Sequence, residues 1–303
     1  MIRPALLSLL LSIPSIAMAE VPRVVTDIAP IHSLVAQVMG ELGEPELLVS
    51  PNATPHDFAL RPSQAAALEQ AQAVFWVGEV LTPWLGPVLD RLAPKATQIE
   101  LLHLPETQTL AFRDDDAFQP GGHDQEDDES TDEHGDIDPH AWLNPDNAIA
   151  WLGVIATELA SLDPENSATY AANAQAAKDR LGDTVSEINE ILAPAKGKTF
   201  IVFHDAFHYF EARFGIEASS AISLGDATAP GPARVERVQT LVRDLDVSCA
   251  FSEPQFSVGL LTTVLEGTDA RVAVLDPIGS TLTVGPELYD ALLRAMAKGI
   301  AEC

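Results

Sequence analysis

Short apolar runs alternate along this chain with longer stretches whose apolar positions recur at helical spacing. The run that starts at Arg23, for example, leads into "IHSLVAQVMG", which has helical periodicity and ends at Gly40. The runs predict strands in residues 23–30, 45–50, 73–78, 97–102, 199–204, 217–223, 247–253 and 271–279. Helices are predicted in 31–40, 62–71, 83–93, 205–215, 231–245, 255–267 and 285–302. Strands that alternate with helices indicate an α/β fold of mostly parallel sheets with helices on both faces.

One predicted helix is much longer than the others and lies between two groups of strands. It begins after Asp163, a good N-cap that is followed by Pro164, and it ends at Pro194. A helix of this length spans roughly 45 Å, which suits a spine between two lobes. We therefore expect an N-terminal lobe at 20–160, a linking helix at 161–195 and a C-terminal lobe at 196–303.

The first nineteen residues are typical of an export signal. Arg3 precedes an apolar stretch too short to span a bilayer, and Ala17-Met18-Ala19 forms a cleavage site. We expect cleavage near Ala19, no membrane insertion afterwards, and a mature protein in an oxidising compartment. In such a compartment Cys249 and Cys303 favour a disulfide, because neither has a Cys or His neighbour at the spacing of metal ligands.

The formal net charge of −28 excludes nucleic acids and anionic membranes as partners. Residues 113–138 carry −11 of it, with twelve Asp/Glu and one Arg. Their composition predicts a disordered acidic loop at 113–137 that contains His123 and His134. This loop is either a solvated insertion or a weak auxiliary collector of metal ions.

Three of the eight histidines occupy positions that favour a binding site. His204 ends a predicted strand, His56 follows one, and His140 precedes a helix. Ligands of parallel sheets bind outside the carboxyl ends of the strands, where Asp276 also lies. Three imidazoles with a carboxylate or water would make a tetrahedral zinc site. Each of these residues taken alone is equally compatible with an ordinary loop or turn position.

Four motifs in this order carry a family resemblance: "TPHDFALRPS", "DPHAWLNP", "FHDAFHYF" and "LDPIG". Together they resemble the cluster A-I solute-binding proteins of metal-uptake ABC transporters, and within them the zinc-specific ZnuA type. The resemblance covers the mature chain, including the long helix and the acidic His-bearing loop. It implies two lobes with a metal in the cleft, and His56, His140 and His204 as ligands.

The resemblance also bears on the metal. Manganese-binding relatives resemble this pattern but carry a carboxylate at the third position, where this chain has His204. Neutral imidazoles suit Zn²⁺, whereas carboxylate-rich sets suit manganese. The fourth ligand varies among relatives between a carboxylate and water, and Asp276 is the candidate here. We expect a periplasmic, monomeric receptor without enzymatic activity that delivers Zn²⁺ to a membrane permease.

Other functions remain possible from the sequence. A manganese or iron receptor, a metallochaperone, or a zinc hydrolase would use similar ligands. "HDAFH" has the His spacing of a metalloprotease motif, but Asp205 replaces the glutamate and His204 ends a strand. His208 is therefore expected near the cleft with at most an indirect role. His32 and His103 are expected to be ordinary residues at element ends.

Overall fold

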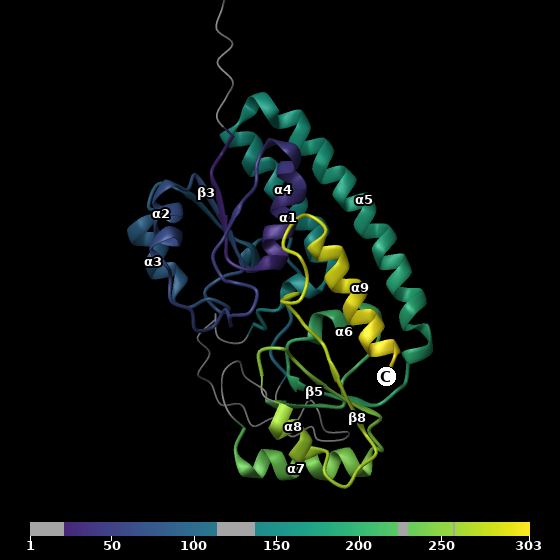
Figure 1. The fold of residues 1–303 in the computed structure, drawn as a ribbon. Helices are drawn as coiled ribbons and strands as arrows, with labels where there is room; N and C mark the ends of the chain where they lie inside the picture. The colour runs from purple at the N-terminus through teal and green to yellow at the C-terminus, as the bar shows by residue number, and fades with distance from the viewer. Residues whose placement is uncertain (1–20, 114–136, 224–229, 257) are drawn as a thin grey trace, which may run out of the picture.

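The computed structural model describes residues 21–113, 137–223, 230–256 and 258–303. These residues form two four-stranded parallel sheets flanked by helices, as Figure 1 shows. The predicted α/β fold with two sheets and a long connecting helix is therefore confirmed. The signal segment, His123 and His134 lie outside the described residues. The lobe boundaries at 20–160, 161–195 and 196–303 remain a prediction.

The first sheet has the strand order β2-β1-β3-β4. Its strands are β1 (Val24–Thr26), β2 (Glu46–Leu47), β3 (Ala73–Trp76) and β4 (Thr97–Glu100). The accompanying helices are α1 (Ala29–Met39), α2 (Pro62–Gln70) and α3 (Leu85–Leu92), with 3₁₀ turns at Gly40–Leu42 and Leu101–His103. Every residue of the central strands β1 and β3 is buried, as expected for strands covered on both faces.

The second sheet repeats this order as β6-β5-β7-β8. Its strands are β5 (Phe200–His204), β6 (Ser220–Ser223), β7 (Cys249–Ser252) and β8 (Arg271–Val274). The helices in this half are α6 (His208–Phe214), α7 (Pro232–Asp244), α8 (Val258–Val264) and α9 (Leu288–Ala301). The central strands β5 and β7 are again fully buried, while the edge strand β8 is exposed along much of its length.

Two helices connect the halves. After a 3₁₀ turn at Ala141–Leu143, α4 (Pro145–Leu162) begins at Asn144, whose side chain accepts a hydrogen bond from the Asp146 amide. The long helix α5 (Ser167–Leu192) is flanked by 3₁₀ turns at Pro164–Asn166 and Ala193–Ala195. It runs along one side of the molecule from the first sheet to the second (Figure 1), and α1, α4 and α9 pack against it. One hydrophobic core therefore extends through both halves.

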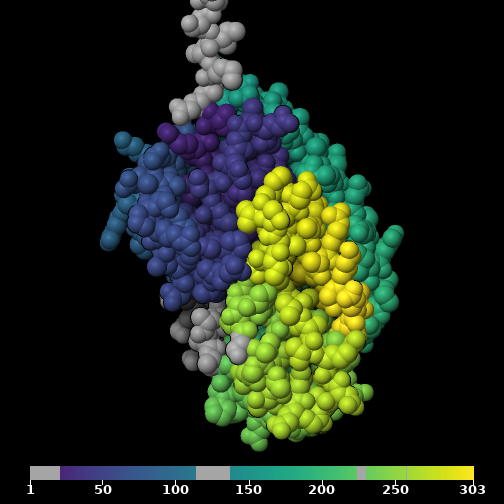
Figure 2. Space-filling view, in the orientation of Figure 1, coloured from purple at the N-terminus to yellow at the C-terminus, as the bar shows by residue number. Residues whose placement is uncertain are grey.

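The predicted disulfide is confirmed. Cys249 in β7 is bonded to Cys303 at the end of the chain, with the two Cα atoms 5.8 Å apart. The space-filling view in Figure 2 shows the C-terminal segment lying against the upper half as well as the lower one. Among the described residues, no helix is both long enough and apolar enough to cross a membrane.

Candidate metal centre

The structure brings His56, His140 and His204 together. The ring centroids of His140 and His204 lie 5.1 Å apart, and that of His56 lies 6.4 Å from each of them. His204 is the last residue of β5, His140 precedes the 3₁₀ turn before α4, and His56 lies in the loop between β2 and α2. Residues far apart in the sequence thus meet at the carboxyl ends of the strands, as expected for a parallel sheet.

These separations can be compared with those of a tetrahedral metal site. With metal–nitrogen bonds of about 2.0–2.1 Å, imidazole centroids lie roughly 5 Å apart. His140 and His204 already have this spacing, whereas His56 must approach by about 1 Å. Accordingly, no three His, Cys, Asp or Glu side chains within the described residues are yet close enough to hold an ion. In this structure the His56 ring therefore lies farther from the other two rings than a tetrahedral site would place it.

The three rings line a small cavity of about 30 Å³. Its walls contain the three histidines with Glu253 and mostly apolar groups: Thr54, Pro55, Leu81, Trp142, Gln255, Phe256, Pro277 and Ile278. A cavity needs at least about 10–15 Å³ of such space to hold one water molecule. The cavity can therefore hold an ion or a water molecule.

A buried carboxylate fixes the orientation of His140. Asp138 Oδ1 lies 2.7 Å from His140 Nδ1 and also accepts a hydrogen bond from the His140 amide at 2.9 Å. Asp138 is 1% exposed. Because an ionised carboxylate only accepts hydrogen bonds, Nδ1 carries the proton and the lone pair of Nε2 remains available to a metal.

His204 has a similar partner from the neighbouring strand. Glu253, which directly follows β7, places Oε1 at 3.4 Å from His204 Nδ1, and both side chains are buried. The contact is longer than that between Asp138 and His140. The Phe256 ring packs edge-on against His204 with the centroids 5.8 Å apart. The His204 ring therefore lies between the Glu253 carboxylate and the Phe256 ring.

The loop that carries His56 is held by α3 and its preceding turn. Trp84 donates a hydrogen bond from Nε1 to the Pro55 carbonyl at 2.8 Å, and its ring packs against Phe58 with the centroids 5.6 Å apart. His56 itself is half-buried, whereas His140 and His204 are buried. Of the three histidines, His56 thus belongs to the least enclosed segment.

Asp276 directly precedes Pro277, which lines the histidine cavity. Its carboxylate accepts hydrogen bonds from the amides of Ile278, Gly279 and Thr281 and from the Ser280 hydroxyl. It lines a separate cavity of about 330 Å³ near α9, although its neighbour Pro277 lines the histidine cavity. In this structure the Asp276 carboxylate therefore stabilises a turn, and Asp276 is not among the residues that line the histidine cavity.

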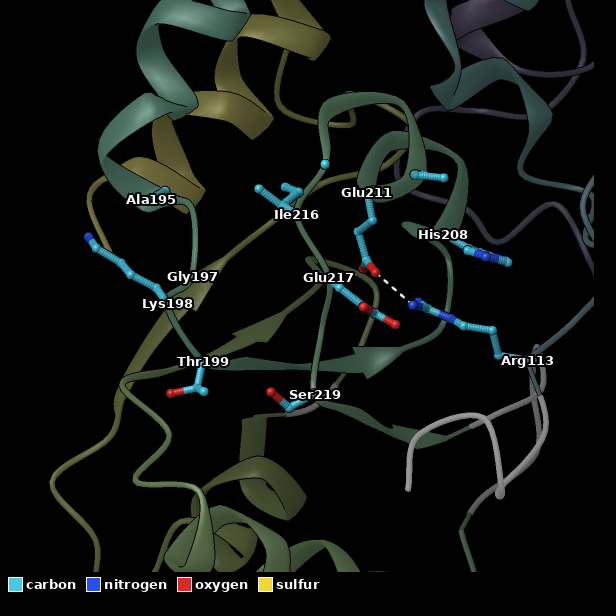
Figure 3. Close-up of a pocket in the computed structure, with 12 residues that line it drawn as sticks. Arg113, Ala195, Gly197, Lys198, Thr199, His208, Glu211, Ile216, Glu217 and Ser219 are labelled. Carbon is cyan, nitrogen blue, oxygen red and sulfur yellow. Dashed lines mark hydrogen bonds and ion pairs between the residues drawn. The ribbon is translucent and has the colours of Figure 1, made fainter. Parts of the chain in front are cut away.

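His208 and Asp205 belong to a charged cluster next to the site. Arg113 donates to both carboxylate oxygens of Asp205 and forms an ion pair with Glu211 at 2.7 Å. Arg113, His208 and Glu211 line a cavity of about 650 Å³. Figure 3 shows the Arg113 and Glu211 side chains facing one another there, with Lys198 pointing away from them. This larger cavity is distinct from the one between the histidines.

Burial and charge set the protonation of this cluster. Burial and the nearby Arg113 lower the pKa of His208, although Asp138 and Asp205 oppose the shift. Burial raises the pKa of Glu211, against the influence of Arg113. His208 Nδ1 lies 3.8 Å from the second oxygen of Asp138. His208 is therefore a neutral neighbour of the carboxylate that orients His140.

The remaining described histidines have local partners. His32 donates from Nε2 to the Pro45 carbonyl at 2.9 Å inside the first half. His103 Nδ1 lies 3.0 Å from Glu100 Oε1 in a partly exposed pair. The structure brings neither residue to the histidine cavity.

The reasoning from sequence missed Asp138 and Glu253. Asp138 stands two residues before His140 in "DPH", and Glu253 ends the predicted strand "VSCAFSE". The position of Glu253 at the carboxyl end of a strand was a usable signal, because adjacent strands in a parallel sheet end at the same edge.

Comparison with known proteins supplies the family context. A family model described as "Zinc-uptake complex component A periplasmic" matches residues 24–303. A protein of Paracoccus denitrificans named high-affinity zinc uptake system protein ZnuA is 39% identical, over 100% of this chain and 99% of that protein.

Solved structures agree with this match. A crystal structure of ZnuA superposes with a TM-score of 0.76 at 26% identity, covering 93% of this chain and 99% of that one. A zinc-bound ZnuA in which residues 138–173 of its own sequence are deleted has a TM-score of 0.76 at 25% identity, covering 92% and 97% of the two chains.

Proposed function

Because this chain belongs to the ZnuA family of zinc-uptake components, we propose that it is a periplasmic zinc receptor. It captures Zn²⁺ between its two halves and passes the ion to the membrane permease of an ATP-driven importer. The name of the Paracoccus denitrificans relative and the zinc-bound ZnuA structure support this proposal. The lack of a membrane-spanning helix among the described residues is compatible with it. We expect the receptor to act as a monomer.

The observation that carries the proposal is the convergence of three imidazoles on a cavity of ion size. His140 and His204 form a preorganised pair, each with a carboxylate on its Nδ1 side. Neutral nitrogen ligands favour zinc over manganese. We assign His56, His140 and His204 as the zinc ligands.

Capture then proceeds with little rearrangement of the buried pair. Zn²⁺ binds to His140, His204 and His56, and the His56 ring approaches the other two by about 1 Å. Because only deprotonated imidazole nitrogen can bind the ion, affinity falls as the pH is lowered through the titration of these histidines. Release requires the reverse movement of the His56 loop.

The fourth coordination position is a separate question. Asp276 remains the predicted ligand, but its carboxylate would first have to exchange its hydrogen bonds from residues 278–281 for the ion. A water molecule requires no such change. Asp276→Asn should weaken zinc binding if the carboxylate is a ligand.

The hydrolase alternative finds little support. A catalytic zinc site needs a free acid or base close to the metal. Asp205, the candidate base, is held by Arg113. Zinc-dependent hydrolysis of ester or lactam substrates, abolished by His204→Ala, would contradict the receptor proposal.

The decisive test is a calorimetric titration of the chelator-stripped mature protein with Zn²⁺, with Mn²⁺ in a parallel run. We expect one tight zinc site, weak manganese binding, and loss of the tight site in His140→Ala. His103→Ala is the matched control, because His103 pairs with Glu100 away from the cavity. Equal affinity for manganese, or tight zinc binding in His140→Ala, would require a different metal or ligand set.

The same titration tests the acidic segment. We propose that it adds weak zinc sites through carboxylates, His123 and His134. Deletion of residues 114–136 should remove weak zinc binding and leave the tight site in place. Unchanged weak binding would leave the segment as a solvated insertion.

A further inference from the structure

The short segment that carries His140 is fixed at both ends by side chains of the second half. At one end, the Tyr209 hydroxyl donates to the Asp138 carbonyl at 2.8 Å. At the other end, the Tyr289 hydroxyl donates to the Trp142 carbonyl at 2.6 Å, and Trp142 Nε1 donates to the Pro277 carbonyl at 2.8 Å. The backbone on either side of His140 is thus held by groups far away in the sequence.

Tyr209 connects His140 to the element that follows His204. It is 1% exposed and lies in α6, which begins four residues after His204. Its hydroxyl also accepts a hydrogen bond from the Leu110 amide at 2.8 Å, next to the point where the Asp138 amide donates to the Leu110 carbonyl. The Tyr209 hydroxyl therefore fixes the backbone of Asp138, and the Asp138 carboxylate in turn orients His140.

Tyr289 gives the other end of the segment a rigid support. Its side chain is 0% exposed and lies in α9, and its own amide donates to Ser33 Oγ at 3.0 Å. Ser33 belongs to α1 and in turn donates to the Pro286 carbonyl at 3.0 Å. Tyr289 is therefore anchored to both α9 and α1, and it cannot follow a shift of residue 142 without disturbing that packing.

We propose that Tyr209 and Tyr289 are positioning residues of the zinc site. This inference rests on the proposed function, since it assumes that His140 binds the ion. The two hydroxyls keep the carbonyls of residues 138 and 142 in place and so hold the His140 imidazole 5.1 Å from His204. His140 and His204 thereby act as one preformed half of the site, to which His56 is added.

The physical reason is the cost of a buried carbonyl without a donor. If a hydroxyl is removed, the segment relaxes toward another partner, because buried polar groups are strongly driven to pair. A change of a few tenths of an ångström at a ligand is enough to weaken a metal site, whose bond lengths are narrowly defined. Tyr→Phe removes the hydroxyl and preserves the ring, so the packing of α6 and α9 is retained.

The test compares Tyr209→Phe and Tyr289→Phe with Tyr170→Phe. Tyr170 in α5 is a matched control, since it is also 0% exposed and its hydroxyl donates to Asp163 Oδ2 at 2.9 Å, outside the histidine cavity. Zinc affinity is measured by competition with a chromophoric chelator. The visible absorption spectrum of the Co²⁺-substituted protein reports the ligand geometry, and thermal unfolding of the metal-free proteins reports stability.

We expect all three variants to lose some metal-free stability. Only Tyr209→Phe and Tyr289→Phe should bind zinc more weakly, on the order of 10-fold each, and show altered Co²⁺ spectra. If zinc affinity and the Co²⁺ spectrum in both variants match those of Tyr170→Phe, the inference is overturned while the proposed function stands. If the wild-type protein binds no zinc, the proposed function fails and this inference fails with it.

Discussion

The two sheets share one strand order but differ in what stands at the carboxyl ends of their central strands. In the first sheet, β1 is followed by Asp27, which is 0% exposed and accepts hydrogen bonds from the Ile28 and Val77 amides. In the second sheet, β5 ends at His204 and β7 is followed by Glu253, and both line the histidine cavity. Backbone amides of the first half thus occupy the Asp27 carboxylate, whereas the His204 and Glu253 side chains face a cavity.

The two sheets therefore have the same topology but different residues at their strand ends. Both crevices lie where the strand order reverses, the usual ligand position in open α/β sheets. In the first half, however, His56 lies in the loop after β2 and not at the end of a central strand. The buried Asp27 accepts hydrogen bonds from backbone amides and so stabilises the fold. Identical topology therefore places two sets of strand ends at equivalent positions, and the side chains at these ends differ between the halves.

The largest expected effect concerns the disulfide, which only the second sheet has. Replacing Cys249 and Cys303 together by Ser should lower the free energy of unfolding by about 4 kcal/mol, because the bond closes a long loop in the unfolded chain. Denaturant titration of the metal-free proteins measures the loss. Reduction of the wild-type protein should reproduce the loss and leave the double variant unchanged. A difference below about 1 kcal/mol would contradict the prediction.

The second prediction compares the acids of the two crevices. Glu253→Gln should weaken zinc binding roughly 10-fold, because His204 loses its charged partner. Asp27→Asn should leave zinc affinity unchanged, since Asp27 contacts backbone amides of its own half. Chelator competition gives both affinities. An equal loss in the two variants would show that the crevices are not functionally different.

The smallest expected effect is a change in stability between pH 6 and pH 7. Burial raises the pKa of Asp27 from 3.8 to about 7, so the folded protein holds this proton more tightly than the unfolded chain does. The resulting stabilisation is complete below the unfolded value and is lost as the pH rises through about 7.

Between pH 6 and 7 the wild-type protein should lose about 1 kcal/mol relative to Asp27→Asn. Denaturant unfolding of both metal-free proteins at the two pH values measures this difference. A constant difference between them would show that Asp27 is ionised in the folded state at both pH values.

Much of the fold was predictable because it depends on local periodicity. The buried runs that became β3, β5 and β7 were recognisable from their apolar composition, and the long helix from its length and flanking prolines. Strand boundaries were less accurate. The run at 45–50 forms only a two-residue strand, although the Leu48 and Val49 amides still bond to the Thr26 and Asp27 carbonyls. Asp163 binds the Tyr170 and Asn166 side chains and not the helix amides.

The site was predictable only in part. The positions of the histidines at element ends indicated where they would meet, because that follows from topology. The direction in which a side chain points does not follow from topology. Asp276 was expected to end a strand, but β8 ends at Val274, and the Asp276 carboxylate accepts hydrogen bonds from its own turn. The contacts of Tyr209 depend on how residues 110 and 138 dock against α6, and no local sequence pattern contains that information.

The packing of α9 against α1 has a consequence for how the chain is made. All residues of α1 are buried, and Ser33 in this helix is bonded to Pro286 and Tyr289. Because ribosomes deliver the N-terminus first, α1 must wait for some 250 residues of further synthesis before its final partner exists. The first half therefore reaches its final packing only when α9 is present, and a chain truncated before Leu288 should be less stable to unfolding than the whole chain.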